Sequence, residues 1–538
     1  MMEMQNEWVW WKHGLIYHIY LLSFYDSNGD GKGDLRGVIQ KLDYLETLGI
    51  NAIWLSPVFK TPMADFGYDV SDYYTIDVVF GNLIDFRELL ELAHSRNIKI
   101  ILDIVLNHTS KEHPWFIESA SDKNNPKRKW YIWKTATGWR KPNNWKTAFG
   151  GSCWEFDKTT KEYYLHSFLK EQPDLNWRNK EVRTEMFNML RYWLDMGVDG
   201  FRFDVINFIV KDKKLRSNPF LYWLYSSQKI RTRNHPKSYK IVRNIRKLLD
   251  EYPDRMSVGE IYALPPGNPK LSASYLSEGD NLLHLTFDFS IFFVRWNARR
   301  FFRAVEKWQT SIPEAGWPSK VFSNHDLSRA FNRIGIGRNP DKKARLMALL
   351  LMTTKGTPFI YYGEEIGMKN GRIPRSRIKD PLGKKLWPFY KGRDGARTPM
   401  QWNDSPYAGF SSTEPWLPLN NDYLDKNVES QKKDPASLLN LYRQLISLRR
   451  ECPALCGGNW MADRDGEKGI FSYTRKQGNE HIHIILNFTT AQKKYYRKFC
   501  MNEKIIFSTI PGAGNLVNDG YYVLQPYEGV ITKKELIY

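Results

Sequence analysis

Residues 200–207, Gly-Phe-Arg-Phe-Asp-Val-Ile-Asn, place an arginine and a carboxylate in a segment that otherwise has the composition of a buried strand. Alternation along a strand puts Phe201 and Phe203 on one face and Arg202 and Asp204 on the other. Burying these charges unpaired would cost on the order of several kcal/mol. Arg202 and Asp204 are therefore expected to pair with each other or with neighbours, and a structural salt bridge would explain this segment on its own.

Three more acids stand in or at the end of short apolar runs, namely Asp103, Glu260 and Asp326. Histidines accompany two of these runs, as His108 and His325. In a parallel barrel the carboxyl ends of all strands meet at one face, where catalytic residues sit. Together with the acid described above, these residues favour one shared site over four unrelated salt bridges.

Paired carboxylates in a pocket lined by aromatic rings suit the cleavage of glycosidic bonds. The chain is 15% aromatic, with 20 Trp and 30 Tyr, and flat rings can cover sugar faces as well as fill cores. No histidine and cysteine cluster has metal-ligand spacing, and no glycine-rich loop opens a helix for phosphates. The pattern thus predicts a carbohydrate-active enzyme without an organic cofactor.

The elements that must position these acids alternate between strand and helix. The predicted order begins with a strand at 15–20, a helix at 35–48 ended by Gly49, a strand at 50–55, a helix at 86–96 and a strand at 99–108. This alternation predicts a parallel sheet, and 538 residues are enough to close it into a barrel. The predicted fold class is therefore α/β, with a (β/α)8 TIM barrel.

Two segments depart from the alternation. Residues 109–177 are rich in Trp, Lys, Asn and Gly and are too long for a connecting loop, which predicts an inserted subdomain after the third strand. Short strands with turns near the end of the chain predict a C-terminal all-β sandwich domain. The predicted organisation is a catalytic barrel in 1–108 and 178–455, an inserted subdomain in 109–177 and a C-terminal β domain in 456–538.

The net charge of +20 comes from 79 Lys and Arg against 59 Asp and Glu. The basic residues are scattered along the chain, so the charge is interpreted as a contribution to solubility, and no nucleic-acid partner is predicted. The chain is predicted to work as a monomer or a small homo-oligomer.

The four cysteines form neither a disulfide framework nor a metal-ligand spacing. The N-terminus lacks a basic region followed by an apolar run, and no stretch approaches the roughly 18 apolar residues of a membrane span. These observations predict a soluble, cytoplasmic protein with no membrane partner.

The polar loop after the first strand has oxygen-bearing side chains at regular spacing. Its candidate calcium ligands are Asp26, Asn28, Asp30, Lys32 through its backbone carbonyl, and Asp34. The twelfth loop position is a glycine where an EF-hand has a bidentate glutamate, so the loop is not an EF-hand. Two interpretations stay open, a structural Ca²⁺ site and a bare loop of Asx turns.

Six short motifs together resemble a known enzyme family. In chain order they are Asp-Ile-Val-Leu-Asn-His at 103–108, Gln-Pro-Asp-Leu-Asn-Trp at 172–177, Gly-Phe-Arg-Phe-Asp at 200–204, Gly-Glu-Ile at 259–261, Ser-Asn-His-Asp at 323–326 and Arg-Thr-Pro-Met-Gln-Trp at 397–402. They resemble the ordered motifs of the α-amylase family, glycoside hydrolase family 13. The motif at 172–177 is similar to that of its α-glucosidase and oligo-1,6-glucosidase branch.

The resemblance implies catalytic roles for three acids. Asp204 would be the nucleophile, Glu260 the general acid and base, and Asp326 the acid that stabilises the transition state. Arg202 would lie beside Asp204 and hold it ionised, whereas Glu260 needs a raised pKa to be protonated near neutrality.

The resemblance also implies a set of substrate-binding residues. Asp69 and Arg393 would grip the non-reducing end of a terminal glucose, with Tyr68 stacked beside it, and His108 and His325 would bind sugar hydroxyls. Such a grip closes the pocket and permits the release of one glucose at a time.

The implied function is that of a retaining, exo-acting α-glucosidase that acts on small oligosaccharides. In this branch a valine after the nucleophile is associated with α-1,6 bonds, and Val205 occupies that position. The segments 149–154 and 165–169 look more like those of α-1,4-active α-glucosidases. Isomaltose-type substrates are therefore only slightly favoured over maltose-type substrates.

Three alternatives remain open at this point. A transglucosidase would share the covalent intermediate and pass the glucose to a sugar instead of water. A trehalose-6-phosphate hydrolase would need a basic grip on phosphate at the pocket mouth. A non-catalytic, amylase-like transporter subunit would need a transmembrane helix and, in degenerate members, would lack the carboxylates, so this alternative is disfavoured.

Overall fold

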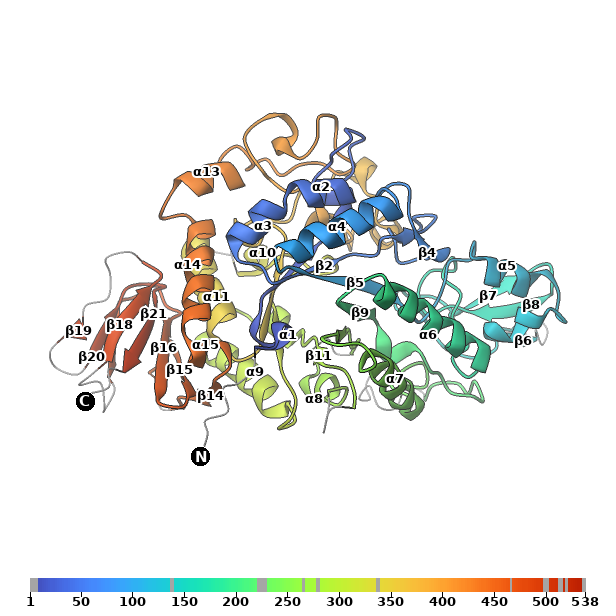
Figure 1. Cartoon of the computed structure of the whole chain (residues 1–538). Helices are drawn as coiled ribbons and strands as arrows, with labels where there is room; N and C mark the ends of the chain where they lie inside the picture. The colour runs from blue at the N-terminus through green and yellow to red at the C-terminus, as the bar shows by residue number, and fades with distance from the viewer. Residues whose placement is uncertain are drawn as a thin grey trace.

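Eight parallel strands form one sheet at the centre of the molecule (Figure 1). The computed structural model describes residues 8–534, apart from 136–139, 220–229, 264–266, 277–280, 335–338, 465–466, 497–502, 511–515 and 518–520. In sequence order the strands are β1 (Ile16–Ile19), β2 (Ala52–Leu55), β5 (Lys99–Val105), β9 (Gly200–Asp204), β10 (Met256–Gly259), β11 (Leu285–Thr286), β12 (Ser319–Val321) and β13 (Thr357–Tyr361).

The sheet runs β11-β10-β9-β5-β2-β1-β13-β12, with every neighbouring pair parallel. Its two ends approach each other, because the Ser319 hydroxyl on β12 donates a hydrogen bond to the Thr286 carbonyl on β11 at 2.7 Å. The result is a nearly closed eight-stranded barrel, which confirms the predicted fold class. All eight strands therefore direct their carboxyl ends to the same face.

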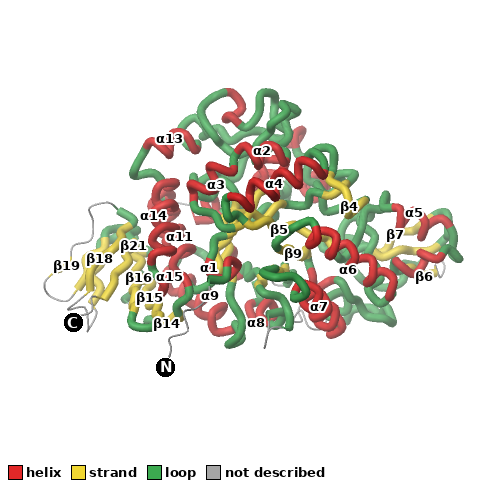
Figure 2. Tube along the Cα trace, viewed as in Figure 1, coloured by secondary structure: helices red, strands yellow, loops and turns green. Residues whose placement is uncertain are grey.

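Helices surround this barrel (Figure 2). They are α1 (Trp10–His13), α2 (Leu35–Gln40), α3 (Leu42–Leu48), α4 (Leu83–Ser95), α6 (Lys180–Asp195), α7 (Pro236–Leu249), α8 (Pro269–Ala273), α9 (Ala298–Ser311), α10 (Ala330–Ile334), α11 (Pro340–Thr353), α12 (Pro381–Leu386), α13 (Val428–Lys433), α14 (Leu438–Glu451) and α15 (Pro453–Cys456). Helix α4 starts with a capping box, in which Asn82 accepts from the Asp85 N–H and the Asp85 side chain accepts from the Asn82 N–H. Among the described residues, no helix combines the length and apolarity needed to cross a bilayer.

Two sequence-based boundaries differ from the structure. The helix expected over 35–48 divides at Lys41, whose backbone angles leave the helical region and whose ammonium lies 3.8 Å from the centre of the Tyr25 ring. The strand expected over 99–108 ends at Val105, because His108 pairs instead with Asp174 on the segment that returns from the insertion.

The insertion follows β5, the third barrel strand, as predicted, and projects to one side of the barrel in Figure 1. It carries α5 (Pro114–Ser121) and a three-stranded antiparallel sheet in the order β6 (Trp133–Thr135), β8 (Glu162–Leu165) and β7 (Trp154–Asp157). Two of the tryptophans in this region, Trp145 and Trp154, are buried together with Cys153 in a small core of its own. The aromatic richness of the segment thus serves mainly to stabilise the subdomain.

The C-terminal region folds into two antiparallel sheets, which confirms the predicted β sandwich. One sheet has the order β14 (Asn459–Ala462), β15 (Ile470–Gln477), β16 (Glu480–Asn487), β21 (Gly529–Lys534) and β18 (Glu503–Ser508), and the other has the order β17 (Lys493–Tyr496), β20 (Tyr521–Leu524) and β19 (Leu516–Val517). Residues from both sheets, such as Ile485 and Tyr522, share a buried cluster.

Helix α11 joins this sandwich to the barrel. A Cβ added at Gly529 on β21 would lie 2.5 Å from the Cδ2 atom of Leu349, so the strand crosses directly over the helix. Leu349 is fully buried there, within the large core that the barrel and the sandwich share.

We expect Leu349→Ala to lower the free energy of unfolding by about 2–5 kcal/mol, because it leaves a cavity at this junction. Thermal unfolding followed by circular dichroism measures the effect. Leu424→Ala is the matched control, since the Leu424 side chain is 56% exposed. Equal melting temperatures for the two variants would show that the junction does not contribute to stability.

Candidate active site

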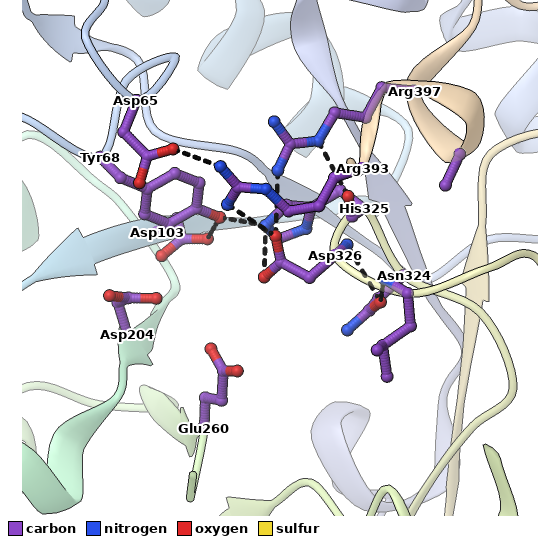
Figure 3. Close-up of polar contacts among 12 residues, drawn as sticks. Asp65, Tyr68, Asp103, Asp204, Glu260, Asn324, His325, Asp326, Arg393 and Arg397 are labelled. Atoms are coloured by element: carbon purple, nitrogen blue, oxygen red, sulfur yellow. Dashed lines mark hydrogen bonds and ion pairs between the residues drawn. The ribbon is translucent and has the colours of Figure 1, made fainter. Parts of the chain in front are cut away.

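The guanidinium of Arg202 lies at the centre of the candidate site and contacts three carboxylates, two on strands β5 and β9 and one directly after strand β10. Its Nη1 atom is 2.7 Å from Asp103 Oδ1 and 2.8 Å from Asp204 Oδ1, and its Nη2 atom contacts Glu260 Oε2. The pairing of Arg202 with Asp204 is the one that strand alternation predicts. Asp204, Glu260 and Asp326 point toward one common space (Figure 3).

The environment changes the acidity of each carboxyl in this group. Burial raises the pKa of Glu260 to about 8, against the attraction of Arg202 and with help from the neighbouring charge of Asp204. Burial likewise raises the pKa of Asp103 to about 7. It also raises the pKa of Asp204, although the Arg202 guanidinium opposes that rise. Glu260 is therefore suited to hold a proton near neutral pH.

The pKa of Asp326 shifts in the opposite direction, because positive charges surround its carboxylate. Its Oδ1 atom lies 3.0 Å from Arg397 Nη2 and 3.3 Å from Arg393 Nη1. Burial alone would raise its pKa, but the charges of His325, Arg393 and Arg397 outweigh burial and lower it. Burial lowers the pKa of His325 to about 3, so the two guanidinium groups are the charges that keep Asp326 ionised at neutral pH.

Tyr68 and the two predicted histidines also lie at this face of the barrel. The Tyr68 hydroxyl donates to Asp103 Oδ2 at 3.0 Å and contacts His325 Nε2 at 2.7 Å. The His108 ring contacts the Tyr68 carbonyl at 3.0 Å through Nε2. Since Asp103 is bound in addition by the Trp54 indole at 3.2 Å, it acts here as a buried anchor for neighbouring side chains.

A cavity of about 270 Å³ lies above these groups. Its lining includes Tyr68, His108, Asp204, Glu260, Asp326 and Arg393 together with the aromatic residues Phe149, Phe168, Tyr262, Phe289, Phe293 and Tyr390. A few converging polar groups inside aromatic walls are typical of a small-molecule site. The residues predicted to be catalytic or to bind the substrate are thus brought together, with one exception.

The exception is Asp69, which does not pair with Arg393 as predicted. Arg393 instead contacts Asp65 Oδ1 at 2.6 Å and Asp380 Oδ1 at 2.8 Å through Nη2. Asp69 is fully buried and accepts hydrogen bonds from the backbone N–H groups of Ala64 and Asp65, both at 2.8 Å. Its carboxylate stabilises the loop that presents Asp65, so the residue that faces the pocket is Asp65 and the prediction for Asp69 is wrong.

The comparisons with known proteins agree with this geometry. The model of the family "Alpha amylase, catalytic domain" matches residues 18–458. The chain belongs to the α-amylase family of glycoside hydrolases. An oligo-1,6-glucosidase of Parageobacillus thermoglucosidasius is 42% identical over 515 residues, covering 90% of this chain and 91% of the relative. One of Bacillus cereus is 38% identical over 563 residues, covering 97% and 99%. The crystal structure of the α-glucosyl transfer enzyme XgtA matches with a TM-score of 0.92 at 37% identity, covering 98% of this chain and all of that chain.

A buried lysine links the inserted subdomain to the barrel in this member of the α-amylase family. Lys211 Nζ lies 2.6 Å from Asp174 Oδ2 and donates to Asn107 Oδ1 at 2.6 Å. Asp174 also accepts from the Ser167 N–H at 2.9 Å, while Asn107 contacts the ring of His108 at 3.1 Å. The position of His108 in the pocket therefore depends on both the barrel and the insertion.

Sequence reasoning missed two charged residues of the site, Asp65 and Arg397. Asp65 stands four residues before Asp69 in the same loop, and only the backbone conformation decides which carboxylate faces the pocket. Arg397 is the first residue of the motif at 397–402. Its positive charge in that motif was the signal that could have marked it as a site residue. Its Nε atom donates to the His325 carbonyl at 2.8 Å, which fixes the loop that carries Asp326.

The predicted calcium loop is a series of Asx turns in the structure. Asp26 accepts from the Asn28 N–H at 3.1 Å, Asn28 from the Asp30 N–H at 2.9 Å, and Asp30 from the Lys32 N–H at 2.8 Å. Asp34 caps helix α2 by accepting from the N–H of the third residue beyond it. Within the described ranges, no three His, Cys, Asp or Glu side chains converge as metal ligands. Calcium binding stays a prediction.

If this loop binds calcium, added Ca²⁺ should raise the melting temperature and a chelator should lower it. Asp30→Asn separates the two interpretations, because asparagine keeps the oxygen that accepts from Lys32 N–H but removes one negative charge. The variant should lose much of the calcium response and keep the metal-free melting temperature. If neither Ca²⁺ nor a chelator changes the melting temperature of the wild-type protein, the calcium interpretation is wrong and the loop consists of Asx turns without a metal.

Proposed function

We propose that the protein is a retaining, exo-acting α-glucosidase that releases terminal glucose from short α-linked oligosaccharides. The observation that carries this proposal is the convergence of Asp204 and Glu260 on Arg202, at a pocket lined by the Arg393–Asp65 pair. The relatives named oligo-1,6-glucosidase support it. Cytoplasmic location and a monomeric or small oligomeric state stay predictions.

In the first step, the Asp204 carboxylate attacks the anomeric carbon, and the bond from that carbon to the leaving oxygen breaks. Glu260 gives its proton to that oxygen, so the rest of the oligosaccharide leaves as an alcohol and glucose remains as an ester on Asp204. The raised pKa of Glu260 fits it to be protonated when the substrate arrives.

In the second step, the Glu260 carboxylate accepts a proton from water as the water oxygen attacks the anomeric carbon. The ester bond to Asp204 breaks, its carboxylate is restored, and glucose leaves with the anomeric configuration of the substrate. Arg202 contacts both acids, so it balances their charge as the proton moves between Glu260 and the reacting oxygens.

Three charged groups are proposed to hold the terminal glucose. Asp326 stays ionised between Arg393 and Arg397 and can accept from sugar hydroxyls as positive charge develops at the ring. The Asp65–Arg393 pair would bind hydroxyls at the non-reducing end. An ion pair at that end of the pocket would prevent a sugar chain from extending beyond the terminal glucose, and the enzyme would therefore act only at chain ends.

The linkage preference is proposed to depend on Val205, directly after the nucleophile. Val205 lines the pocket and has left-handed backbone angles, φ 34° and ψ 46°, which are rare for a β-branched residue. Its rigid side chain is therefore fixed beside the leaving group. We expect α-1,6 bonds to be slightly preferred over α-1,4 bonds.

Transfer of glucose to a second sugar is the alternative fate of the same intermediate. The similarity to the α-glucosyl transfer enzyme XgtA favours measuring it. Product analysis at a high concentration of maltose separates transfer from hydrolysis, because transfer to maltose forms a trisaccharide whereas hydrolysis forms glucose.

Glucose release from isomaltose and from maltose tests the proposal directly. We expect faster release from isomaltose, and a loss of about 10⁴- to 10⁶-fold in kcat for Asp204→Asn. Nuclear magnetic resonance of the first product should detect α-glucose before mutarotation. Release from neither sugar, with wild type no better than the variant, would contradict the proposal and direct attention to phosphorylated disaccharides.

The pH profile tests the role of Glu260. Because its pKa is raised to about 8, kcat/KM for a disaccharide should fall as the pH rises through about 8 and the proton is lost. An aryl glucoside with a good leaving group needs little protonation, so its kcat/KM should fall less over the same range. Parallel profiles for the two substrates would argue against Glu260 as the acid.

Paired variants test which aspartate grips the glucose. Asp65→Asn should lower kcat/KM by about 10- to 100-fold, since it removes a charged partner of Arg393 at the pocket. Asp69→Asn should mainly lower the melting temperature, because one of the two carboxylate oxygens that accept from the backbone N–H groups of Ala64 and Asp65 is replaced by an amide nitrogen. The reverse ranking would restore Asp69 as the binding residue.

A further inference from the structure

A second cavity, of about 450 Å³, lies where the inserted subdomain meets the barrel. The insertion contributes residues within 123–133 and Glu162 on β8, and the barrel contributes residues within 209–215, which follow β9. Residues 176–178, just before α6, also line it. Among the described residues, none lines both this cavity and the active-site cavity. We call the second cavity the junction groove.

Cations outnumber acids along the junction groove. The side chains that line it include the cations Lys123, Arg128, Lys129, Arg178, Lys211 and Lys213 and the acids Glu162 and Asp212. Both acids are already paired, Glu162 with Arg128 and Asp212 with Arg216. Lys211 is held in turn by Asp174.

The remaining cations of the groove have no countercharge. Among the described residues, no carboxylate forms an ion pair with Lys123, Lys129, Lys213 or Arg178. The undescribed segments nearest to them along the chain, 136–139 and 220–229, contain no Asp or Glu. Positive charge of this kind attracts an anion from solution.

The shape of the groove limits the kind of anion. Its floor is formed by buried residues, namely Trp177, Ile209 and Val210. The guanidinium of Arg178 is fixed beside this floor, because Nη2 donates to the Lys211 carbonyl at 2.6 Å. The unpaired lysines that line the groove are exposed. A closed recess with one fixed guanidinium and several ammonium groups fits a compact, multiply charged anion, whereas a membrane or a long polymer needs an open face.

We propose that the junction groove binds a small phosphate-bearing molecule, and that its phosphate lies among Arg178, Lys129 and Lys213. A phosphate monoester carries about −1.5 to −2 charges near pH 7 and has three acceptor oxygens, so it can bind several cations at once. Lys129 belongs to the insertion and Lys213 to the barrel. The bound molecule would therefore reinforce the junction that Lys211 already forms with Asp174 and Asn107.

Calorimetry with glycerol 3-phosphate and with inorganic phosphate, at a salt concentration of about 0.15 M, tests the inference. We expect saturable binding of glycerol 3-phosphate and no binding of glycerol, the matched neutral molecule. Equal affinity for inorganic phosphate would show that the phosphate alone is recognised. Tighter binding of the ester would show that the groove also holds the organic part.

A double variant links this binding to the groove. Lys129→Ala combined with Lys213→Ala should raise the Kd for glycerol 3-phosphate by about tenfold or more, because two charge-assisted hydrogen bonds are lost. Lys240→Ala combined with Lys247→Ala is the matched control, since both lysines are exposed on α7 and neither lines the groove. The Kd of the control should equal that of the wild type.

Hydrogen–deuterium exchange locates the bound molecule independently of these variants. Glycerol 3-phosphate should slow the exchange within 126–133 and 209–213 and leave that of α7 unchanged. The inference would be overturned if neither phosphate binds saturably, if both double variants raise the Kd equally, or if only segments at the active-site cavity are protected. Binding of a short oligonucleotide through the same lysines, without binding of glycerol 3-phosphate, would also overturn it and assign the groove to nucleic acid.

Discussion

One buried guanidinium determines the arrangement of the active site. Arg202 has almost no exposed surface, and its two terminal nitrogens contact an acid on β5, an acid on β9 and the acid that directly follows β10. Burying a single charge would be strongly unfavourable, and three neighbouring acids would repel one another without it. Removing Arg202 would therefore leave three buried carboxyls that must become protonated or move apart. The interaction that stabilises this end of the barrel also holds Asp204 and Glu260 within reach of one sugar.

The barrel alone does not complete the pocket. Its strand ends supply the acids, while the insertion after β5 supplies Phe149 and Phe168 as walls. The contact of Lys211 with Asp174 and Asn107 fixes the insertion to the barrel at the base of that wall. A rigid parallel sheet thus positions the charges, and long connections shape the space around them.

The sequence predicted those features that depend on periodicity and on local composition. Alternating strands and helices indicated the barrel, and Arg202 with Asp204 could be placed on one face because strands alternate. The choice between Asp65 and Asp69 could not be predicted, since both stand in one loop and only its folded backbone directs one carboxylate to Arg393. The exposure of Phe389 was equally hidden, because an aromatic residue in a sequence gives no sign of whether the fold will cover it. The break at Lys41 was not predicted either; the ammonium of this residue lies over the rings of Tyr25 and Trp402, and local sequence does not reveal these contacts.

The left-handed backbone at Val205 has a consequence for how this protein can change over time. Glycine would adopt φ 34° without steric cost, so a glycine there would relieve local strain. The same replacement would free the peptide that follows the nucleophile and remove the side chain beside the leaving group. Stability therefore favours glycine at position 205, whereas activity favours valine. The strained valine is retained because catalysis needs a nucleophile that is held in one position.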